Sequence, residues 1–354
     1  MSSPLAPISR STVLTDAHGP VLRPWERADD DRVAAFVDRH AEGLVYYGPA
    51  FRRYLLAIVG GTCRSQLAFE HGELTGVLPL LEKDGPYGRV LNSLPFFGSN
   101  GGALAVTEAS RAALQAEYER AAATAASAVW IPQPFVEAPQ PPATLTDERI
   151  AQWTPLDPAY PEALWTRVDA SARRNVQKAV ASGVTVRETD QGLAFLEAVH
   201  RENMAAIGGR AKPREFFSAL PDTMAFGRDW RLYLAEQHGT PLAALLTFEA
   251  SKTVEYVTPV VLEAARGVQP TAAILSHAMI DAARRGFTRW NWGGTWVTQE
   301  GVYRFKRKWG ATERRYHYSV SVNDQTLLDR SAADLTAGYP WYYTVPFGAL
   351  RSTR

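Results

Sequence analysis

Cysteine is almost absent from this sequence, since Cys63 is the only one among 354 residues. A single cysteine excludes an internal disulfide framework and any zinc site built from several cysteines. The seven histidines are scattered, and none forms a close pair with carboxylates at the spacing of metal ligands. We therefore expect no metal site and no tightly bound cofactor.

Long apolar runs and a strong net charge are missing as well. No stretch of about 18 apolar residues occurs, and the N-terminal segment MSSPLAPISRSTVLTD lacks the basic and then apolar pattern of a signal peptide. The net charge of +1 gives no bulk attraction to DNA or membranes. These absences predict a soluble, cytoplasmic protein without membrane insertion or DNA binding, and they leave the oligomeric state open.

Apolar residues, by contrast, are plentiful. The chain is 46% hydrophobic and 11% aromatic, which is enough for two packed domains of ordinary size. Helical and strand patterns alternate, which indicates a mixed α/β (α+β) fold. The first part predicts helices from Asp29, over 50–58 and over 107–128, a hairpin over 65–81, a strand over 89–94 and a glycine-rich loop at 96–102.

A second unit is predicted to begin near residue 158. One apolar stripe predicts a single helix that starts near Pro161 and ends at Gly183. The following patterns predict helices over 191–205, 213–220 and 274–285, a hairpin over 230–249 and a strand over 252–259.

The two predicted hairpins resemble each other. LAFEHGELTGVLPLLE and LAEQHGTPLAALLTFE share Leu-Ala, then His-Gly, then an apolar strand. Their His-Gly turns, at His71 and His238, lie 238 − 71 = 167 residues apart. A supersecondary unit repeated at one offset favours two similarly folded halves. The alternative is chance similarity between two hairpins rich in leucine and alanine.

The densest cluster of candidate features lies in RWNWGGTWVTQEGVYRFKRKWGATERRYHYSV, residues 289–320. This segment predicts a strand, a break at Gly293 and Gly294, a basic amphipathic helical turn and a return to strand. Glycine permits close approach of the backbone to a ligand. The basic turn is suited to an anion or a developing oxyanion.

These motifs resemble the Fem-type branch of the GNAT acyltransferase superfamily, which comprises peptidoglycan-bridge aminoacyl transferases and their relatives. GVYRFKRKWGA is similar to the Phe-Lys-x-x-Phe/Trp-Gly signature of that branch. RRNVQKAVASGVTV, the second hairpin with its neighbouring strand, and AAILSHAMIDAARRGFTRWNWGG are similar to other parts of it. The first half fits through its own hairpin and the SLPFFGSNGG loop, so the resemblance covers about residues 20–325.

The resemblance implies two tandem GNAT-like domains, each a mostly antiparallel mixed sheet flanked by helices. Residues 1–157 would form the acceptor side, and residues 158–354 the donor side. The C-terminal tail either packs back on a domain or covers the cleft.

Acyl transfer to an amine is the chemistry that the resemblance implies. Lys306 matches the lysine of the family's Phe-Lys pair and is expected to neutralise the oxyanion or hold a donor phosphate, while Phe305 walls the donor. The other residues expected to bind the donor are Arg304, Lys308, Gly293, Gly294, Arg266 and Gly267. A structural alternative is that Phe305 and Trp309 are core anchors and that the charges form a solvated face.

Acceptor binding is expected from a second set of residues, namely Arg173, Arg174, Lys178, Tyr46, Tyr47, Asn100 and Tyr256. Arg174 and Lys178 share a helix face because they are four residues apart. A solvated helix face explains the basic residues equally well, and a tight turn explains the glycines beside Asn100.

Donor identity is the main open choice. Acetyl-CoA users of the superfamily carry Arg/Gln-x-x-Gly-x-Gly/Ala before a helix, so that backbone N–H groups bind pyrophosphate. Here Ala264 stands where the basic or amide residue belongs, and Pro270 removes an N–H donor. This departure favours aminoacyl-tRNA, whose acceptor end would be a partner, and a muropeptide-like or small-molecule amine as acceptor. Acyl-CoA-dependent N-acyl transfer and a non-catalytic binding module remain alternatives.

Overall fold

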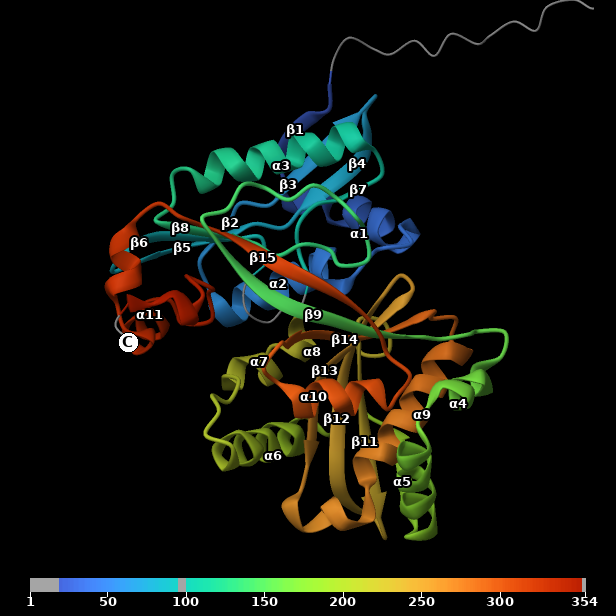
Figure 1. The fold of residues 1–354 in the computed structure, drawn as a ribbon. Coiled ribbons are helices and arrows are strands. Elements are labelled where there is room, and N and C mark those ends of the chain that lie inside the picture. Colours follow the sequence, from blue (N-terminus) through green and yellow to red (C-terminus); the bar gives the residue numbers. More distant parts are fainter. Residues whose placement is uncertain (1–18, 95–99, 352–354) are drawn as a thin grey trace, which may run out of the picture.

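Strand β9 (Leu145–Pro155) crosses the middle of the molecule and joins its two halves (Figure 1). It pairs antiparallel with β14 (Arg289–Trp296) on one edge and with β15 (Thr312–Val322) on the other. The computed structural model describes residues 19–94 and 100–351. Through β9, strands from both halves form one continuous sheet of eleven strands.

The first half contributes two groups of strands. Its helices and strands are β1 (Val21–Pro24), α1 (Asp30–Arg39), α2 (Pro49–Val59), β2 (Thr62–Cys63), β3 (Gln66–Glu70), β4 (Glu73–Leu78), β5 (Leu81–Gly85), β6 (Gly88–Asn92), β7 (Leu104–Ala105), α3 (Glu108–Ala122) and β8 (Ser127–Trp130). Four strands form a separate sheet in the order β1-β3-β4-β7, and α3 packs against β3 and β4. The others continue the large sheet beyond β15 in the order β8-β6-β5-β2.

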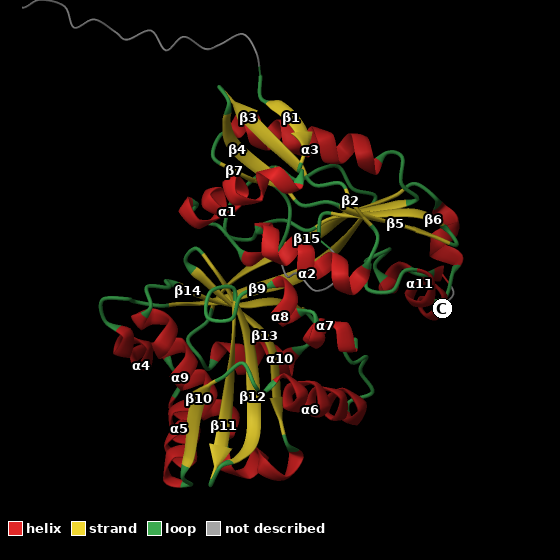
Figure 2. Cartoon of the chain, turned by 180° about the vertical axis from the view of Figure 1, so that it is seen from behind, coloured by secondary structure: helices red, strands yellow, loops and turns green. Residues whose placement is uncertain are grey.

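The second half begins with helices and then builds the other end of the large sheet. Its elements are α4 (Leu164–Arg167), α5 (Ala170–Ala181), β10 (Val184–Glu188), α6 (Leu193–Ala206), α7 (Arg214–Ser218), α8 (Leu220–Thr223), β11 (Trp230–Gln237), β12 (Thr240–Ala250), β13 (Thr253–Val261), α9 (Pro270–Arg284), β14, α10 (Glu300–Arg307), β15 and α11 (Ala332–Gly338). Strands β10 to β14 follow one another in space, all antiparallel except β13 and β14, which are parallel. Helices α5 and α9 lie on one side of this sheet and α6 on the other (Figure 2).

The two predicted hairpins, β3–β4 and β11–β12, have the same turn. His71 and Gly72 have φ values of 51° and 81°, and His238 and Gly239 have 51° and 78°. Positive φ at both turn residues is the geometry of the two-residue turns that match the twist of paired strands.

The hairpins also share an irregularity in their pairing. The register shifts between Ala68 and Phe69 in the first hairpin and between Ala235 and Glu236 in the second. The two shifts are 235 − 68 = 167 residues apart, the same offset as the turns. Turn and bulge therefore repeat together, which supports the interpretation of two similarly built halves.

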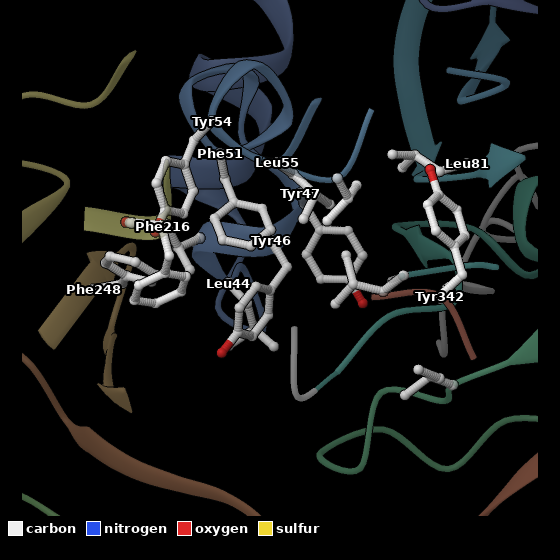
Figure 3. Packing of buried hydrophobic residues seen from close by; sticks show 14 of the residues in the cluster. Leu44, Tyr46, Tyr47, Phe51, Tyr54, Leu55, Leu81, Phe216, Phe248 and Tyr342 are labelled. Atoms are coloured by element: carbon white, nitrogen blue, oxygen red, sulfur yellow. Dashed lines mark hydrogen bonds between the residues drawn. The ribbon is translucent and has the colours of Figure 1, made fainter. Parts of the chain in front are cut away.

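Aromatic packing joins α2 of the first half to the second half (Figure 3). Phe51 and Tyr54 meet Phe248 of β12 with ring centroids 6.0 and 5.7 Å apart. The Tyr54 hydroxyl donates to the Phe216 carbonyl oxygen at 2.5 Å. All four side chains are fully buried, and each contributes about 1.5–3 kcal/mol of burial free energy.

The C-terminal tail after α11 packs against the first half. Asn92 bonds both backbone groups of Tyr343, donating to its carbonyl at 2.9 Å and accepting from its N–H at 2.8 Å. Tyr339 and Tyr342 donate to the carbonyl oxygens of Gly88 and Gly60, each at 2.7 Å.

The single helix expected between Pro161 and Gly183 is wrong, because the structure divides it. Val168 is extended between α4 and α5. The Asp169 carboxylate accepts from the Ser171 N–H at 2.7 Å as an N-cap, and its own N–H donates to the Lys308 carbonyl at 2.8 Å. A new helix start fixed by these two bonds outweighs the continuous apolar stripe.

The strand break expected at Gly293 and Gly294 is also wrong, because β14 continues through both glycines to Trp296 and shows only a register shift in its pairing with β9. The other predicted helices and strands, and the mixed α/β fold, are confirmed to within about six residues at their ends. Part of the glycine-rich loop at 96–102 lies outside the described residues. The boundary between residues 157 and 158 stays a prediction. No helix among the described residues is both long and apolar enough to cross a membrane.

The shared turn geometry predicts a specific stability effect. A methyl group added at Gly239 meets no atom within 4 Å. Gly239→Ala therefore measures only the free-energy cost of holding an alanine at a φ of 78°. We expect a loss of about 1–2 kcal/mol in the free energy of unfolding, measured by urea titration. Gly301→Ala in α10 is the control, because Gly301 also has open space but no positive φ. Equal unfolding free energies for the two variants would contradict the assignment.

Candidate functional site

The parallel strands β13 and β14 pair over only three residues and then separate. Their last registered pair is Glu255 with Asn291. Just beyond it, Val257 is a bulge in β13, since its two neighbours pair with consecutive residues of β12. On β14, Gly293 takes a φ of 72° where the pairing with β9 shifts. Beyond these residues β13 and β14 no longer pair with each other.

Aromatic rings cover one face of this strand pair. Trp292 lies 4.9 Å from Tyr256, 5.9 Å from Trp290 and 6.1 Å from Phe305 of α10, measured between ring centroids. Trp290 and Trp292 are buried, whereas Phe305 is 36% exposed. Phe305 thus extends a buried aromatic wall to the surface.

A buried polar network lies on the other face. Asn291 Nδ2 is within 2.9 and 3.1 Å of the two Glu255 carboxylate oxygens and 3.0 Å from Asn100 Oδ1. The Tyr46 hydroxyl donates to Glu255 Oε2 at 2.9 Å. The network thereby links two first-half segments to the ends of the β13–β14 pairing.

Two of the predicted acceptor residues, Tyr46 and Asn100, therefore meet at one point. Asn100 is 1% exposed, and its Nδ2 has no hydrogen-bond partner among the described residues. A buried donor without a partner costs about 1–3 kcal/mol. The neighbouring Tyr47 is fixed separately, since its hydroxyl donates to the Gly101 carbonyl at 2.6 Å.

Lys306 is the buried charge of the site. Its side chain is 4% exposed in total, and Nζ donates to Thr295 Oγ1 of β14 at 2.6 Å. The Thr295 hydroxyl in turn donates to Gln152 Oε1 of β9 at 3.0 Å. No carboxylate pairs with Lys306 in the described part of the chain. Burial lowers the pKa of Lys306 to about 8, so the amine is still mostly protonated at neutral pH.

A cavity of about 280 Å³ opens beside α10. It lies between α5, the start of α9 and α10, and Phe305, Arg304 and Lys308 line it. Arg304 also pairs with Glu300 at 2.6 Å, and both side chains are exposed. Lys306 does not line this cavity, so Phe305 and Lys306 present neighbouring but different surfaces of one helix.

The segment before α9 does not present a row of free N–H groups. Residues Glu263–Val268 form a 3-10 helix, in which the Ala265 N–H bonds to the Leu262 carbonyl. Gln269 follows in a left-handed conformation, its N–H bonds to the Arg266 carbonyl, and Pro270 is the first residue of α9. Arg266 is exposed and pairs with Glu263 at 2.7 Å.

The remaining predicted residues are distributed over both sides of the sheet. Gly294 is required where it stands, since a Cβ there would lie 2.5 Å from the Tyr316 hydroxyl oxygen. Arg173, Arg174 and Lys178 lie on α5, which packs against α9 on the side opposite α6. The structure therefore does not bring these three cations to the network at Tyr46.

Sequence reasoning missed Glu255 and Asn291, the centre of the polar network. Both have apolar neighbours in the sequence, Glu255 in VEYV and Asn291 in WNW. A carboxylate or amide inside an otherwise buried strand is itself a signal of a specific partner. Gln152 and Thr295, which hold Lys306, carry a weaker signal because both are common in exposed strands.

Comparisons with known proteins agree with this architecture. Residues 166–307 match the family model described as an acetyltransferase (GNAT) domain. No protein among those with curated descriptions matches the sequence.

Several solved structures share the fold. FemX is similar over 84% of this chain and 97% of its own, with a TM-score of 0.65 and 16% identity. The C-terminal domain of a putative lysylphosphatidylglycerol synthetase from Agrobacterium fabrum is similar over 90% of this chain and 99% of its own, with a TM-score of 0.56 and 12% identity. L-PGS from Bacillus licheniformis is similar over 85% and 94%, with a TM-score of 0.50 and 13% identity.

These matches define the class. Residues 166–307 match a GNAT acetyltransferase domain, and the chain as a whole shares the fold of FemX. The resemblance expected from the sequence is thus confirmed at the level of fold, which at these identities is what the structural likeness shows.

The buried amine of Lys306 predicts a rise of stability with pH. The unfolded chain keeps its lysine proton up to about pH 10.5, whereas the folded protein releases it near pH 8. Between these values the unfolded state binds more protons, so the free energy of unfolding increases with pH, by up to about 3 kcal/mol. Lys306→Met should lack this contribution. Urea titrations of both proteins between pH 7 and 10 measure it, and parallel pH profiles would contradict it.

Proposed function

We propose that this protein is an aminoacyltransferase, which moves an aminoacyl group from aminoacyl-tRNA to a primary amine. The acceptor is a peptidoglycan-precursor-like molecule or another small amine, and no tightly bound cofactor takes part. Lys306 carries the proposal, because it is a buried cation without a carboxylate among the described residues. The fold similarity to FemX, and to a protein whose name describes a lysyl product, supports the same class.

The chemistry needs a stabilised oxyanion. A neutral acceptor amine attacks the ester carbonyl of the donor, so that an N–C bond forms and the carbonyl oxygen becomes negative. The intermediate collapses as the ester C–O bond breaks, the tRNA oxygen leaves with a proton, and the nitrogen loses one. The Lys306 ammonium has three hydrogens, and one bonds to Thr295. The other two have no acceptor among the described residues and are available to the oxyanion.

The donor side is supported by the cavity beside α10. Lys308 and Arg304 offer positive charge to phosphate, and Phe305 offers a flat surface to a base or ribose. In the segment before α9 the N–H groups of Ala265 and Gln269 bond to carbonyls of the same segment, and Pro270 has no N–H. This arrangement disfavours a backbone cradle for pyrophosphate and therefore favours aminoacyl-tRNA over acyl-CoA.

The acceptor side is supported by the network on the opposite face. Asn100 Nδ2, which has no partner among the described residues, is a donor suited to a carbonyl or hydroxyl of the acceptor. Tyr46 and Glu255 are already bonded to each other, so they hold the geometry around it. We assign Arg173, Arg174 and Lys178 to the cavity side of the sheet, where Ala172 and Asn175 of the same helix line the cavity.

Lys306→Ala tests the proposed catalytic residue. Loss of one oxyanion stabiliser should lower turnover of aminoacyl transfer by about 10²-fold or more. Turnover within about twofold of the unmodified protein would remove Lys306 from the mechanism. Lys252→Ala is the control, because Lys252 is an exposed residue of the β12–β13 turn and should keep full activity.

Donor choice is tested by direct binding of both candidates to the unmodified protein. We expect charged tRNA to bind and to protect the protein against thermal unfolding, and coenzyme A to do neither at comparable concentrations. Binding of charged tRNA should weaken as salt increases, because it depends on phosphate contacts. Micromolar binding of coenzyme A without tRNA binding would overturn this choice and favour an acyl-CoA-dependent N-acyltransferase.

A further inference from the structure

The edge of β13 that pairs with β14 is unpaired beyond Glu255. From there on, β13 has β12 on one side and no strand of the described residues on the other. The Leu262 N–H bonds back to β12 at the Leu242 carbonyl, 2.9 Å away. Backbone groups alternate in direction along a strand, so the N–H and carbonyl groups of the preceding residue, Val261, point away from β12. Pro259 shares that direction.

The side chain of Asn203 in α6 bonds to the backbone of Val261 in the way that a neighbouring strand would. Its Nδ2 donates to the Val261 carbonyl at 3.0 Å, and its Oδ1 accepts from the Val261 N–H at 3.2 Å. One amide side chain thus makes both hydrogen bonds that a neighbouring strand would make.

Pro259 and Lys212 limit the hydrogen bonds that two further residues of the same edge could form with a neighbouring strand. Proline has no N–H to offer. Lys212 Nζ donates to the carbonyl of the bulge residue Val257 at 3.3 Å and to Thr258 Oγ1 at 2.6 Å. Val261 thus has both pairing groups occupied, Val257 has its carbonyl occupied, and Pro259 has no N–H.

Lys212 is firmly built into this position. Its backbone N–H donates to His200 Nε2 at 3.0 Å, and its amine lies 4.6 Å from the centre of the Phe216 ring. Burial lowers the pKa of His200 to about 4, so this histidine is a neutral acceptor at pH 7. The pKa of Lys212 itself falls to about 7 for the same reason.

Sheet edges are often blunted by proline or lysine to prevent pairing with other proteins. This edge, however, is internal to the large sheet, because it begins where the pairing of β13 with β14 ends at Glu255. An extended chain that carries amides binds to an open edge by adding itself as a strand. Because these groups are bonded or missing, β13 offers such a chain few backbone hydrogen bonds.

We infer that Asn203 and Lys212 are specificity-determining residues, which keep a donor from pairing along β13. They exclude donors with an extended amide-bearing arm, such as the pantetheine of coenzyme A, in favour of donors that present only an ester end. The inference rests on the proposed function in one respect, namely that the protein takes an acyl donor, whose arm would pass along this edge of β13.

Binding of pantetheine to the full-length protein tests this inference. Asn203→Ala frees both backbone groups of Val261, so this variant should bind pantetheine at least about tenfold more tightly than the unmodified protein in calorimetric titrations. Asn203→Asp, which keeps an acceptor for the Val261 N–H, should show a smaller gain. Glu202→Ala, an exposed neighbour on α6, should show none.

Three results would overturn the inference: equal affinity for the two proteins, no measurable binding to either, or tighter binding to the unmodified protein. Thermal melting confirms that each variant is folded, and Lys212→Met is the second variant if Asn203→Ala is not. The titration contains neither tRNA nor acceptor amine. Failure of the proposed aminoacyl transfer would appear in the transfer assay, and not in this titration.

Discussion

The end of the β13–β14 pairing is the constraint on which the rest of the site depends. Parallel pairing stops at Glu255 and Asn291, and the buried contact between these side chains fixes the position of that stop. A buried carboxylate is tolerated only when it is hydrogen-bonded, and here Tyr46 and Asn291 supply the donors. Because Tyr46 and Asn100 come from the first half, the polar network forms only where both halves meet.

Lys306 is a second buried charge, and its partner among the described residues is a neutral hydroxyl group. Its cation is held by the neutral Thr295 hydroxyl, which is positioned by Gln152 of β9. No carboxylate of the described residues pairs with this ammonium, and burial lowers its pKa to about 8. Strand β9 therefore has two roles. It joins the two halves, and its Gln152 positions the Thr295 hydroxyl that holds Lys306.

Local patterns in the sequence predicted much of the fold and part of the site. The repeated His-Gly turns predicted two related hairpins, and RFKRKWG predicted α10 with Lys306. Strand β9 was not predicted, because LTDERIAQWTP carries charges whose partners come together only in the folded chain. The Asp147 carboxylate accepts from the Tyr343 hydroxyl, and the Arg149 guanidinium stacks on the Trp296 ring. The Glu255–Asn291 network joins segments 36 to 209 residues apart, and spacing along the chain does not reveal such contacts.

The central claim is that a donor carbonyl is bound at Lys306, beside the end of the β13–β14 pairing. The most direct measurement is a crystal structure with a non-hydrolysable 3′-aminoacylamido-adenosine, which mimics the end of aminoacyl-tRNA. The account predicts the amide oxygen at hydrogen-bond distance, about 3 Å, from Lys306 Nζ, with the adenosine against Phe305. An analogue bound with its carbonyl away from Lys306 would contradict the account.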